Sequence, residues 1–208
     1  MEGIFNNINQ FKEAFEIQCI QLIVEAYRSS IADNKFETNW NENDFTDTLN
    51  SYISNNSVRL QWNIVNNREH YIYDSKGKSA KGFADSEDRI DLRLTTINSQ
   101  QEFSYYFEAK RLKENDSSLQ HRYINTGIDN FKNKNKYPKG ILLGYQVQGD
   151  ISNTVNKICS MLCNSGRNDE VLIEKTFALY EHYYESNHPD IGTLKHLIFD
   201  YTMSKLNK

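Results

Sequence analysis

The sequence predicts a mixed α/β fold, in which helices cover the faces of a β-sheet. Segments whose apolar residues recur every three or four positions alternate with segments in which apolar and polar residues take turns. Residues 140–147 also form an almost wholly apolar run between two helical segments, which is typical of a buried strand. We therefore expect a helix, three or four antiparallel strands, a helix, a strand, a helix and further strands. A chain of 208 residues fits one domain.

Four segments show helical periodicity. The longest covers residues 4–30, where apolar side chains form one broad stripe. After a polar stretch, a second helix is expected to begin near Asn43, with Asn43 or Asp44 as its cap. Two more helices are expected at residues 119–134 and 151–163.

The remaining segments outside the central hairpin indicate strands and turns. Alternation predicts strands, Asn-rich sequence predicts a turn, and a Gly- and Lys-bearing stretch predicts a loop. In chain order these are a strand at 58–64, a turn at 66–69, a short strand at 70–73, a loop at 74–87, and strands at 176–184 and 193–201.

The most informative segment is a two-faced hairpin formed by residues 89–97 and 102–110. A tight turn centred on Ser99 and Gln100 pairs residues whose numbers add to 199. One face then carries Ile90, Leu92, Leu94, Phe103, Tyr105, Phe107 and Ala109. The other face carries Arg89, Asp91, Arg93, Thr95, Ser104, Tyr106, Glu108 and Lys110.

This register places Asp91 opposite Glu108, with Lys110 on the same face. Directly opposed side chains lie roughly 5 Å apart at Cβ. Magnesium prefers oxygen ligands and commonly takes one or two carboxylates plus water, so Asp91, Glu108 and the backbone carbonyl of Ala109 are candidate ligands for Mg²⁺ or Mn²⁺. Lys110 could orient or deprotonate an attacking water, or stabilise charge on a phosphate. The alternative is an ordinary solvent-exposed strand face, because short motifs of this kind also occur by chance.

Two stretches, RIDLRL and YYFEAKRL, resemble the PD-(D/E)xK nuclease and restriction-endonuclease-like superfamily. The downstream run YINTGIDNFKNKNKYPKGILLGYQV is similar to small bacterial members found near mobile elements or phage-defence genes. The resemblance implies a core of one helix, a three-stranded antiparallel meander, a helix and another strand. It covers residues 41–150, so that residues 1–40 form an N-terminal helical extension and residues 151–208 add a helix and strands.

The resemblance also implies roles for individual residues. Asp91 matches the metal-binding Asp, Glu108 the second acidic ligand and Lys110 the catalytic lysine. Glu42 is the candidate acidic residue from the first core helix, with Asp44 and Glu25 as alternatives. Ile90 stands where the motif usually has proline, and no clear Gln-x-x-x-Tyr element follows the lysine. The implied activity is hydrolysis of DNA phosphodiester bonds with Mg²⁺ or Mn²⁺.

Basic residues downstream of the motif suggest where DNA would bind. Phosphate contacts from such residues position a nucleic acid without reading its sequence. The candidates are Arg111, Lys113, Arg122, Lys132, Lys134 and Lys136. An exposed helix face and a solvated loop are the alternative interpretation of the same residues.

Composition narrows the function classes further. The net charge of −4 is unlike that of a nucleic-acid coat protein, and a non-catalytic binding module with the same fold is the competing function. Three Cys at no disulfide spacing, no secretory signal and no long apolar run predict a cytoplasmic protein outside the membrane. A homodimer or a partner subunit is a further expectation. Ser186 and His188 suggest a hydrolase only weakly, because a nucleophile elbow and a supporting acid are missing from the sequence pattern.

Overall fold

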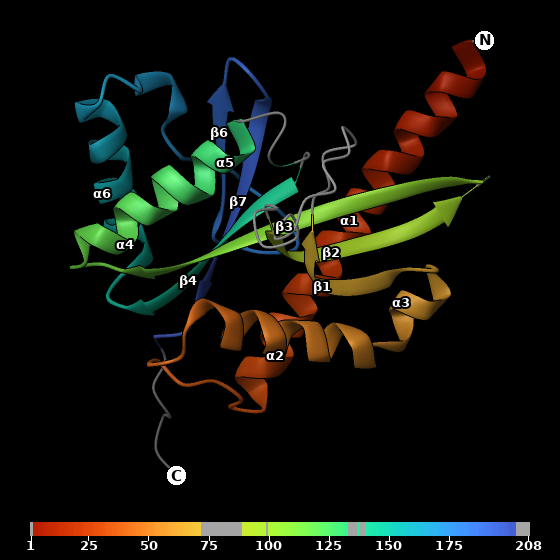
Figure 1. Ribbon diagram of the computed structural model, residues 1–208, viewed down its shortest axis with the longest axis horizontal. Helices are drawn as coiled ribbons and strands as arrows, with labels where there is room; N and C mark the ends of the chain where they lie inside the picture. Colours follow the sequence, from red (N-terminus) through yellow and green to blue (C-terminus); the bar gives the residue numbers. More distant parts are fainter. Residues whose placement is uncertain (1, 72–88, 99, 133–136, 138–139, 203–208) are drawn as a thin grey trace, which may run out of the picture.

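The protein is described by a computed structural model that covers residues 2–71, 89–98, 100–132, 137 and 140–202 (Figure 1). Within these residues, seven strands form one mixed sheet in the order β1-β2-β3-β4-β7-β6-β5. The strands are β1 (Val65–Tyr71), β2 (Arg89–Asn98), β3 (Gln101–Lys113), β4 (Gly140–Gln148), β5 (Ile173–Glu174), β6 (Tyr183–His188) and β7 (Gly192–Asp200).

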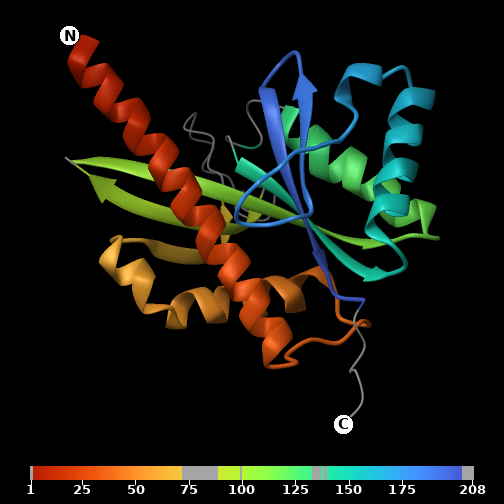
Figure 2. The same ribbon diagram turned by 180° about the vertical axis from the view of Figure 1, so that it is seen from behind.

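Helices cover both faces of this sheet, as the sequence predicts (Figures 1 and 2). One face packs against α1 (Glu2–Ala32) and α2 (Glu42–Asn55), and their apolar stripes form the larger core with inward side chains of β2, β3, β4 and β7. The other face packs against a helical run and α6 (Ile151–Asn164). That run consists of α4 (Ser117–Arg122), the π-helical turn η2 (Tyr123–Ile128) and α5 (Asp129–Lys132). None of the helices in the described residues is both long and apolar enough to cross a bilayer.

The predicted hairpin register is confirmed from the turn to Leu92, but not beyond it. Asp91 does not pair with Glu108 in the ladder and instead accepts from the Ala109 amide, and Ile90 packs in the smaller core rather than beside Leu92. β2 and β3 pair from Leu92↔Phe107 to Asn98↔Gln101, and each pair adds to 199. Gln100 has a positive φ of 66°, as the tight turn requires. Because side chains alternate along a strand, Leu92 and Leu94 enter the larger core together with Phe103, Tyr105, Phe107 and Ala109 of β3.

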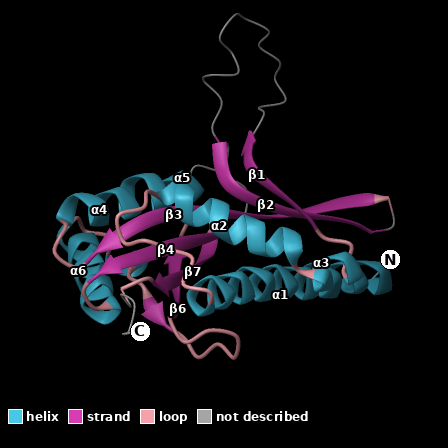
Figure 3. Ribbon diagram, turned by 90° about the horizontal axis from the view of Figure 1, so that it is seen from below, coloured by secondary structure: helices cyan, strands magenta, loops and turns pink. Residues whose placement is uncertain are grey.

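β3 changes partners along its length, and this positions the candidate site. Its first half pairs with β2, whereas Tyr106–Lys113 pairs in parallel with β4. β4 continues the parallel part of the sheet by pairing with β7. Figure 3 shows β2 and β3 side by side at one end and β3 beside β4 at the other. The edge of β3 beyond Phe107 that faces away from β4 is therefore available to side chains from other elements.

Three sequence-based predictions about local structure are wrong. The predicted strand at 58–64 is instead α3 (Ser57–Gln61) and a turn, because the Asn56 side chain caps a helix by accepting from the Val58 amide. The predicted turn at 66–69 lies inside β1. The segment 176–184 is mostly a turn, in which the Tyr180 amide donates to the Phe177 carbonyl, and β6 begins only at Tyr183.

The start of α2 also differs from the prediction, by two residues. Its cap is Asn41, whose side chain accepts from the Asp44 amide while the Asp44 carboxylate accepts from the Asn41 amide. This reciprocal box makes Glu42 the first residue of the helix. The other predicted helices and the strands at 140–147 and 193–201 are found, and the predicted loop at 74–87 lies outside the described residues.

Candidate functional site

β2 and β3 separate beyond the pair Leu92↔Phe107, and we call the space between them the fork. Along the fork, the edge of β3 that faces away from β4 has no neighbouring strand in the described residues, and carboxylates bind its amides instead. Asp91 Oδ2 accepts a hydrogen bond of 2.7 Å from the Ala109 amide. Glu42 Oε1 accepts one of 3.0 Å from the Arg111 amide. Amides two residues apart project from the same strand edge, so two carboxylates from β2 and α2 take the place of a neighbouring strand there.

Glu108 and Lys110 project from the same strand and lie close together in the interior. Lys110 Nζ donates to Glu108 Oε1 at 2.5 Å and to the Ala109 carbonyl at 3.0 Å. The exposed fractions are only 4% for Glu108 and 6% for Lys110. A solvated strand face would leave such side chains in water, and unpaired charges are costly to bury. Glu108 and Lys110 therefore form a buried ion pair. The Arg93–Glu102 ion pair near the turn is, by contrast, partly exposed.

Burial makes the ionised forms of both carboxyl groups costly at this site. Burial, reinforced by the charge of Asp91, raises the pKa of Glu108 to about 8, against the opposing effect of Lys110. Burial also raises the pKa of Asp91, although Lys110 and the Ala109 amide favour its charged form. Two carboxyl groups that resist ionising together are typical of positions where an additional positive charge would be bound favourably.

Glu42 lies on the same edge of β3 as Asp91, two residues further along the strand. Besides the Arg111 amide, its carboxylate binds the Arg122 guanidinium, with Arg122 Nη2 2.9 Å from Glu42 Oε2. A hollow of about 230 Å³ lies here, lined by Asn41, Glu42, Asn43, Arg111, Leu119 and Arg122. Of the alternatives, Asp44 is used in the helix cap and Glu25 binds Gln21 and Asn56. Glu42 is thus the acidic residue of α2 that reaches the fork.

Side chains alone supply only part of the ligand set that a magnesium-type ion needs. Within the described residues, no three His, Cys, Asp or Glu side chains form a group able to hold a metal. Two carboxylates, one carbonyl and water are nevertheless a sufficient donor set for a hard divalent cation. Glu108 Oε2 is buried and accepts no well-formed hydrogen bond within the described residues, although the nearby Tyr137 hydroxyl favours its carboxylate form. Asp91, Glu108 and the Ala109 carbonyl are therefore the groups that would hold the ion.

The π-helical turn η2 packs directly over the lysine. A Cβ added to Gly127 would lie 3.0 Å from Leu142 Cδ2 and 3.5 Å from Lys110 Cγ. Widened turns of this kind occur frequently at functional sites. Here the turn places Gly127, which has no side chain, where η2 crosses the aliphatic part of the Lys110 side chain.

We expect Gly127→Val to displace Lys110 and to lower activity more than stability. The branched side chain would press on Leu142 and on the lysine stem. In the catalytic role that the resemblance implies for Lys110, a shift of about 1 Å costs roughly a hundredfold in rate. Thermal melting and DNA cleavage of the variant, beside Thr126→Val at the exposed neighbouring position, measure the two effects. Equal activity in Gly127→Val and wild type would show that the close approach has no influence on Lys110.

The predicted DNA-contacting residues separate into four groups. Arg111 and Arg122 line the hollow beside Glu42, and Arg111 Nε is buried without a hydrogen-bond partner in the described residues. Lys113 lies at the end of β3. Lys132 is instead held in an ion pair with Glu170 at 2.7 Å. Lys134 and Lys136 lie outside the described residues.

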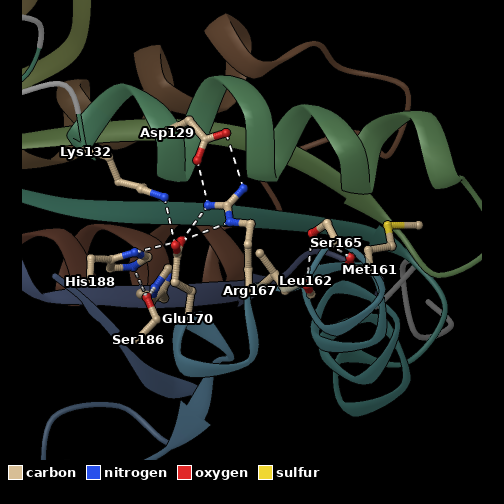
Figure 4. Close-up of polar contacts among 10 residues, drawn as sticks. Asp129, Lys132, Met161, Leu162, Ser165, Arg167, Glu170, Ser186 and His188 are labelled. Carbon is tan, nitrogen blue, oxygen red and sulfur yellow. Dashed lines mark hydrogen bonds and ion pairs between the residues drawn. The ribbon is translucent and has the colours of Figure 1, made fainter. Parts of the chain in front are cut away.

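A second polar cluster, which sequence reasoning underrated, lies between α5 and β6 (Figure 4). Ser186 Oγ is 2.7 Å from His188 Nε2, and His188 Nδ1 is 3.0 Å from Glu170 Oε2. The supporting acid that the sequence pattern lacks is thus Glu170, from η3 (Asn168–Glu170). Ser186 also lies 2.7 Å from His196 Nε2, and its exposed fraction is 0%.

The contacts of this cluster define one consistent set of protons. Glu170 also accepts from Arg167 and Lys132 and is therefore charged, so His188 Nδ1 donates to it. Ser186 then donates to His188 Nε2 and accepts from His196 Nε2, whose Nδ1 accepts from the Tyr123 hydroxyl at 2.9 Å. Every polar atom along this path is satisfied, and the serine is buried. The arrangement is a structural network that joins α5, η3, β6 and β7, as Figure 4 shows for its outer part.

Only one signal in the sequence could have revealed this cluster. Glu170 precedes His188 by 18 residues, and no periodic pattern connects them. Alternation along β6 places Ser186 and His188 on the same face as Tyr184, which does indicate polar groups on an inward face. Comparison of the chain with protein-family models, with characterised proteins and with solved structures found no match, so the geometry described above is the basis for assigning a function.

Proposed function

We propose that this protein is a metal-dependent nuclease of the PD-(D/E)xK type that hydrolyses phosphodiester bonds of DNA, with Mg²⁺ or Mn²⁺ as its cofactor. One observation carries the proposal: Asp91, Glu108, Lys110 and Glu42 come from three separate elements and meet at one fork of the sheet. The order α2, β1 to β3, α4 to α5 and β4 also follows the core of the restriction-endonuclease-like fold.

The chain's own residues account for the remaining chemistry. A divalent cation, when bound, supplies a Lewis acid at the scissile phosphate. Lys110 has three N–H donors, two of which bind Glu108 and the Ala109 carbonyl, so the third can hold the attacking water or a phosphate oxygen. Arg111 and Arg122 can bind the neighbouring phosphate, because guanidinium groups match phosphate oxygens bidentately.

The second candidate is a non-catalytic module that retains the fold and binds nucleic acid or a protein partner. It is favoured by the Lys110 ammonium, which already neutralises Glu108 and caps the Ala109 carbonyl. The net charge of −4 points in the same direction. A bacterial role in phage defence or mobile-element biology, and a homodimer or partner subunit, remain proposals at the level of the resemblance.

Metal binding and cleavage together test the proposal. Calorimetric titration with Mg²⁺ and Mn²⁺ should show binding, and plasmid and linear DNA should be cut with metal and remain intact with EDTA. Metal binding without cleavage of any DNA or RNA substrate would favour the binding module. Neither binding nor cleavage would remove the nuclease proposal.

Arg122→Ala should weaken DNA binding about equally for all sequences. Loss of one phosphate contact is expected to reduce the slope of log affinity against log salt by about 1. Fluorescence anisotropy over a series of KCl concentrations measures this slope. Arg28→Ala is the control, because Arg28 is an exposed residue of α1 that binds the Leu179 carbonyl away from the fork. An unchanged slope in Arg122→Ala would show that Arg122 only neutralises Glu42.

A further inference from the structure

A second hollow lies beside the candidate site and has a different chemical character. Its volume is about 380 Å³, and its lining residues are Lys35, Trp40, Thr48, Ser51, Tyr52 and Asn55. The four residues from α2 recur at three- and four-residue steps and form one stripe, which borders the buried stripe of Phe45, Leu49 and Ile53. The loop between α1 and α2 supplies the other two residues.

Two aromatic rings with fixed positions form the apolar walls of this hollow. Trp40 packs on Phe45, with ring centroids 5.6 Å apart at an angle of 64°. The Tyr52 hydroxyl donates to Asp33 Oδ2 at 2.7 Å, which holds this ring by its outer end. Both side chains remain partly accessible. Rigid, accessible aromatic faces are the groups on which nucleic-acid bases stack.

The polar groups of the hollow have unused hydrogen-bonding capacity. Lys35, Ser51 and Asn55 are exposed, and their side chains make no hydrogen bond or ion pair within the described residues. A carboxamide can donate and accept at the edge of a planar base, and an ammonium can bind a carbonyl or phosphate oxygen. The Asp33 carboxylate nearby is occupied by Tyr52 and disfavours a ligand that is wholly anionic. A planar heteroaromatic group with polar edges fits this combination best.

The position of the hollow relates it to the candidate active site. Trp40 lines this hollow, whereas the next three residues, Asn41 to Asn43, line the hollow beside the fork. Along α2, Thr48 lies six residues beyond Glu42, which corresponds to about 9 Å at 1.5 Å per residue. The two hollows are therefore neighbours whose linings adjoin at Trp40 and Asn41, so a nucleic-acid strand bound at the fork is long enough to reach Trp40.

We propose that the hollow between Trp40 and Tyr52 binds a nucleobase of single-stranded nucleic acid, one or a few nucleotides from the bond cut at the fork. This inference rests on the proposed nuclease function. It assigns the enzyme a preference for substrates with an unpaired segment, such as an overhang, a flap or a locally opened duplex. In this proposal, Asn55 and Ser51 contact the edge of the base, and Lys35 contacts a carbonyl or phosphate oxygen of the nucleotide.

The two tryptophans of the chain, Trp40 and Trp62, allow a direct test in EDTA, where no cleavage occurs. In Trp62→Phe, all tryptophan fluorescence comes from Trp40, and a short oligothymidylate should quench it to saturation. An abasic oligomer of the same length should not. In Trp40→Phe, the remaining Trp62 should show no quenching. Absence of quenching in Trp62→Phe, or equal quenching by the abasic oligomer, would overturn the proposal.

Variants of the second ring extend the test. Tyr52→Leu should lower the affinity for oligothymidylate about tenfold, the size expected for loss of one base–aromatic stack. Tyr52→Phe keeps the ring and should keep the affinity, although both variants lose the bond to Asp33. Equal affinity in Tyr52→Leu and wild type would contradict the assignment. Quenching without metal-dependent cleavage would contradict the nuclease function and support a hollow that only binds a base. Cleavage without quenching would contradict base binding in the hollow and leave the nuclease proposal intact.

Discussion

Asp91→Asn and Lys110→Met should each lower the rate of metal-dependent DNA cleavage by about a hundredfold to a thousandfold. The carboxamide of Asp91→Asn retains an oxygen that can accept from the Ala109 amide, so the fork is preserved while the negative charge is lost. The thioether of Lys110→Met keeps the volume of the buried stem and removes the ammonium, after which Glu108, with its pKa already near 8, is expected to protonate. Both variants should therefore fold.

The control for these variants is Glu102→Gln. Glu102 lies on the same strand and face as Glu108, at the exposed end where it pairs with Arg93. Initial rates of plasmid nicking, with calorimetric titration of Mg²⁺ on each variant, separate lost metal binding in Asp91→Asn from lost catalysis in Lys110→Met. If both variants cut DNA as fast as Glu102→Gln, the fork is not the catalytic site.

Ser186→Ala should cost about 2–4 kcal/mol of the free energy of unfolding. The hydroxyl is the partner of two buried imidazole nitrogens, and each buried group left without a hydrogen bond costs about 1–3 kcal/mol. Urea denaturation measures the loss. Ser160→Ala is the matched control, because Ser160 is exposed on α6 and its hydroxyl binds only the Asn156 carbonyl. A loss below about 1 kcal/mol, within the usual range for a surface substitution, would show that the network is not held together by the serine.

The same network predicts a stability that falls in acid. Burial lowers the pKa of His196 from 6.5 to about 3, and burial also lowers the pKa of His188 despite the opposing effect of Glu170. The unfolded chain binds these protons at higher pH than the folded chain, so the stability is fully present above pH 6.5 and declines as the pH falls toward 3. For Glu170, burial opposes ionisation, but Arg167 and Lys132 outweigh it and lower the pKa to about 2, which adds a loss below pH 4.5.

Urea midpoints measured above and below pH 6.5 test this expectation. The groups that face the two histidines are Tyr123, Ser186, Glu170, Lys132 and Arg167, and among these only Glu170 titrates in acid. A loss that begins near 6.5 therefore reports the histidines, and a later one near 4.5 reports the carboxylate. A midpoint that stays constant down to pH 4.5 would contradict neutral, buried histidines.

The candidate site was predictable because its geometry is local. A tight turn and two alternating segments determine the register of the hairpin as far as Leu92 and Phe107. Just beyond these residues, Asp91 reaches the Ala109 amide, and Glu108 and Lys110 pair with each other. Glu42 required the resemblance, since no periodic pattern connects α2 with β3. The structure then supplied its contact, a carboxylate at the first turn of α2 that binds the Arg111 amide.

Other features were not predictable because tertiary packing or side-chain caps decided them. The alternation at 58–64 is also compatible with one short helix, and the Asn56 cap selects the helix. Glu170, His188 and His196 come from three elements that meet only after β4, β7 and β6 have assembled. The change of partner along β3, from β2 to β4, likewise depends on the order of strands in the finished sheet.

The carboxylates on the free edge of β3 have a consequence for how related sequences should be read. An unpaired strand edge invites pairing with another chain, and Asp91 and Glu42 block this edge by occupying the Ala109 and Arg111 amides. Selection against aggregation would therefore retain both acids in a descendant that had lost all catalysis. Lys110 covers the Ala109 carbonyl of the same edge in addition to its pairing with Glu108. The presence of Asp91 and Glu42 in a related sequence would therefore not by itself be a sign of catalysis.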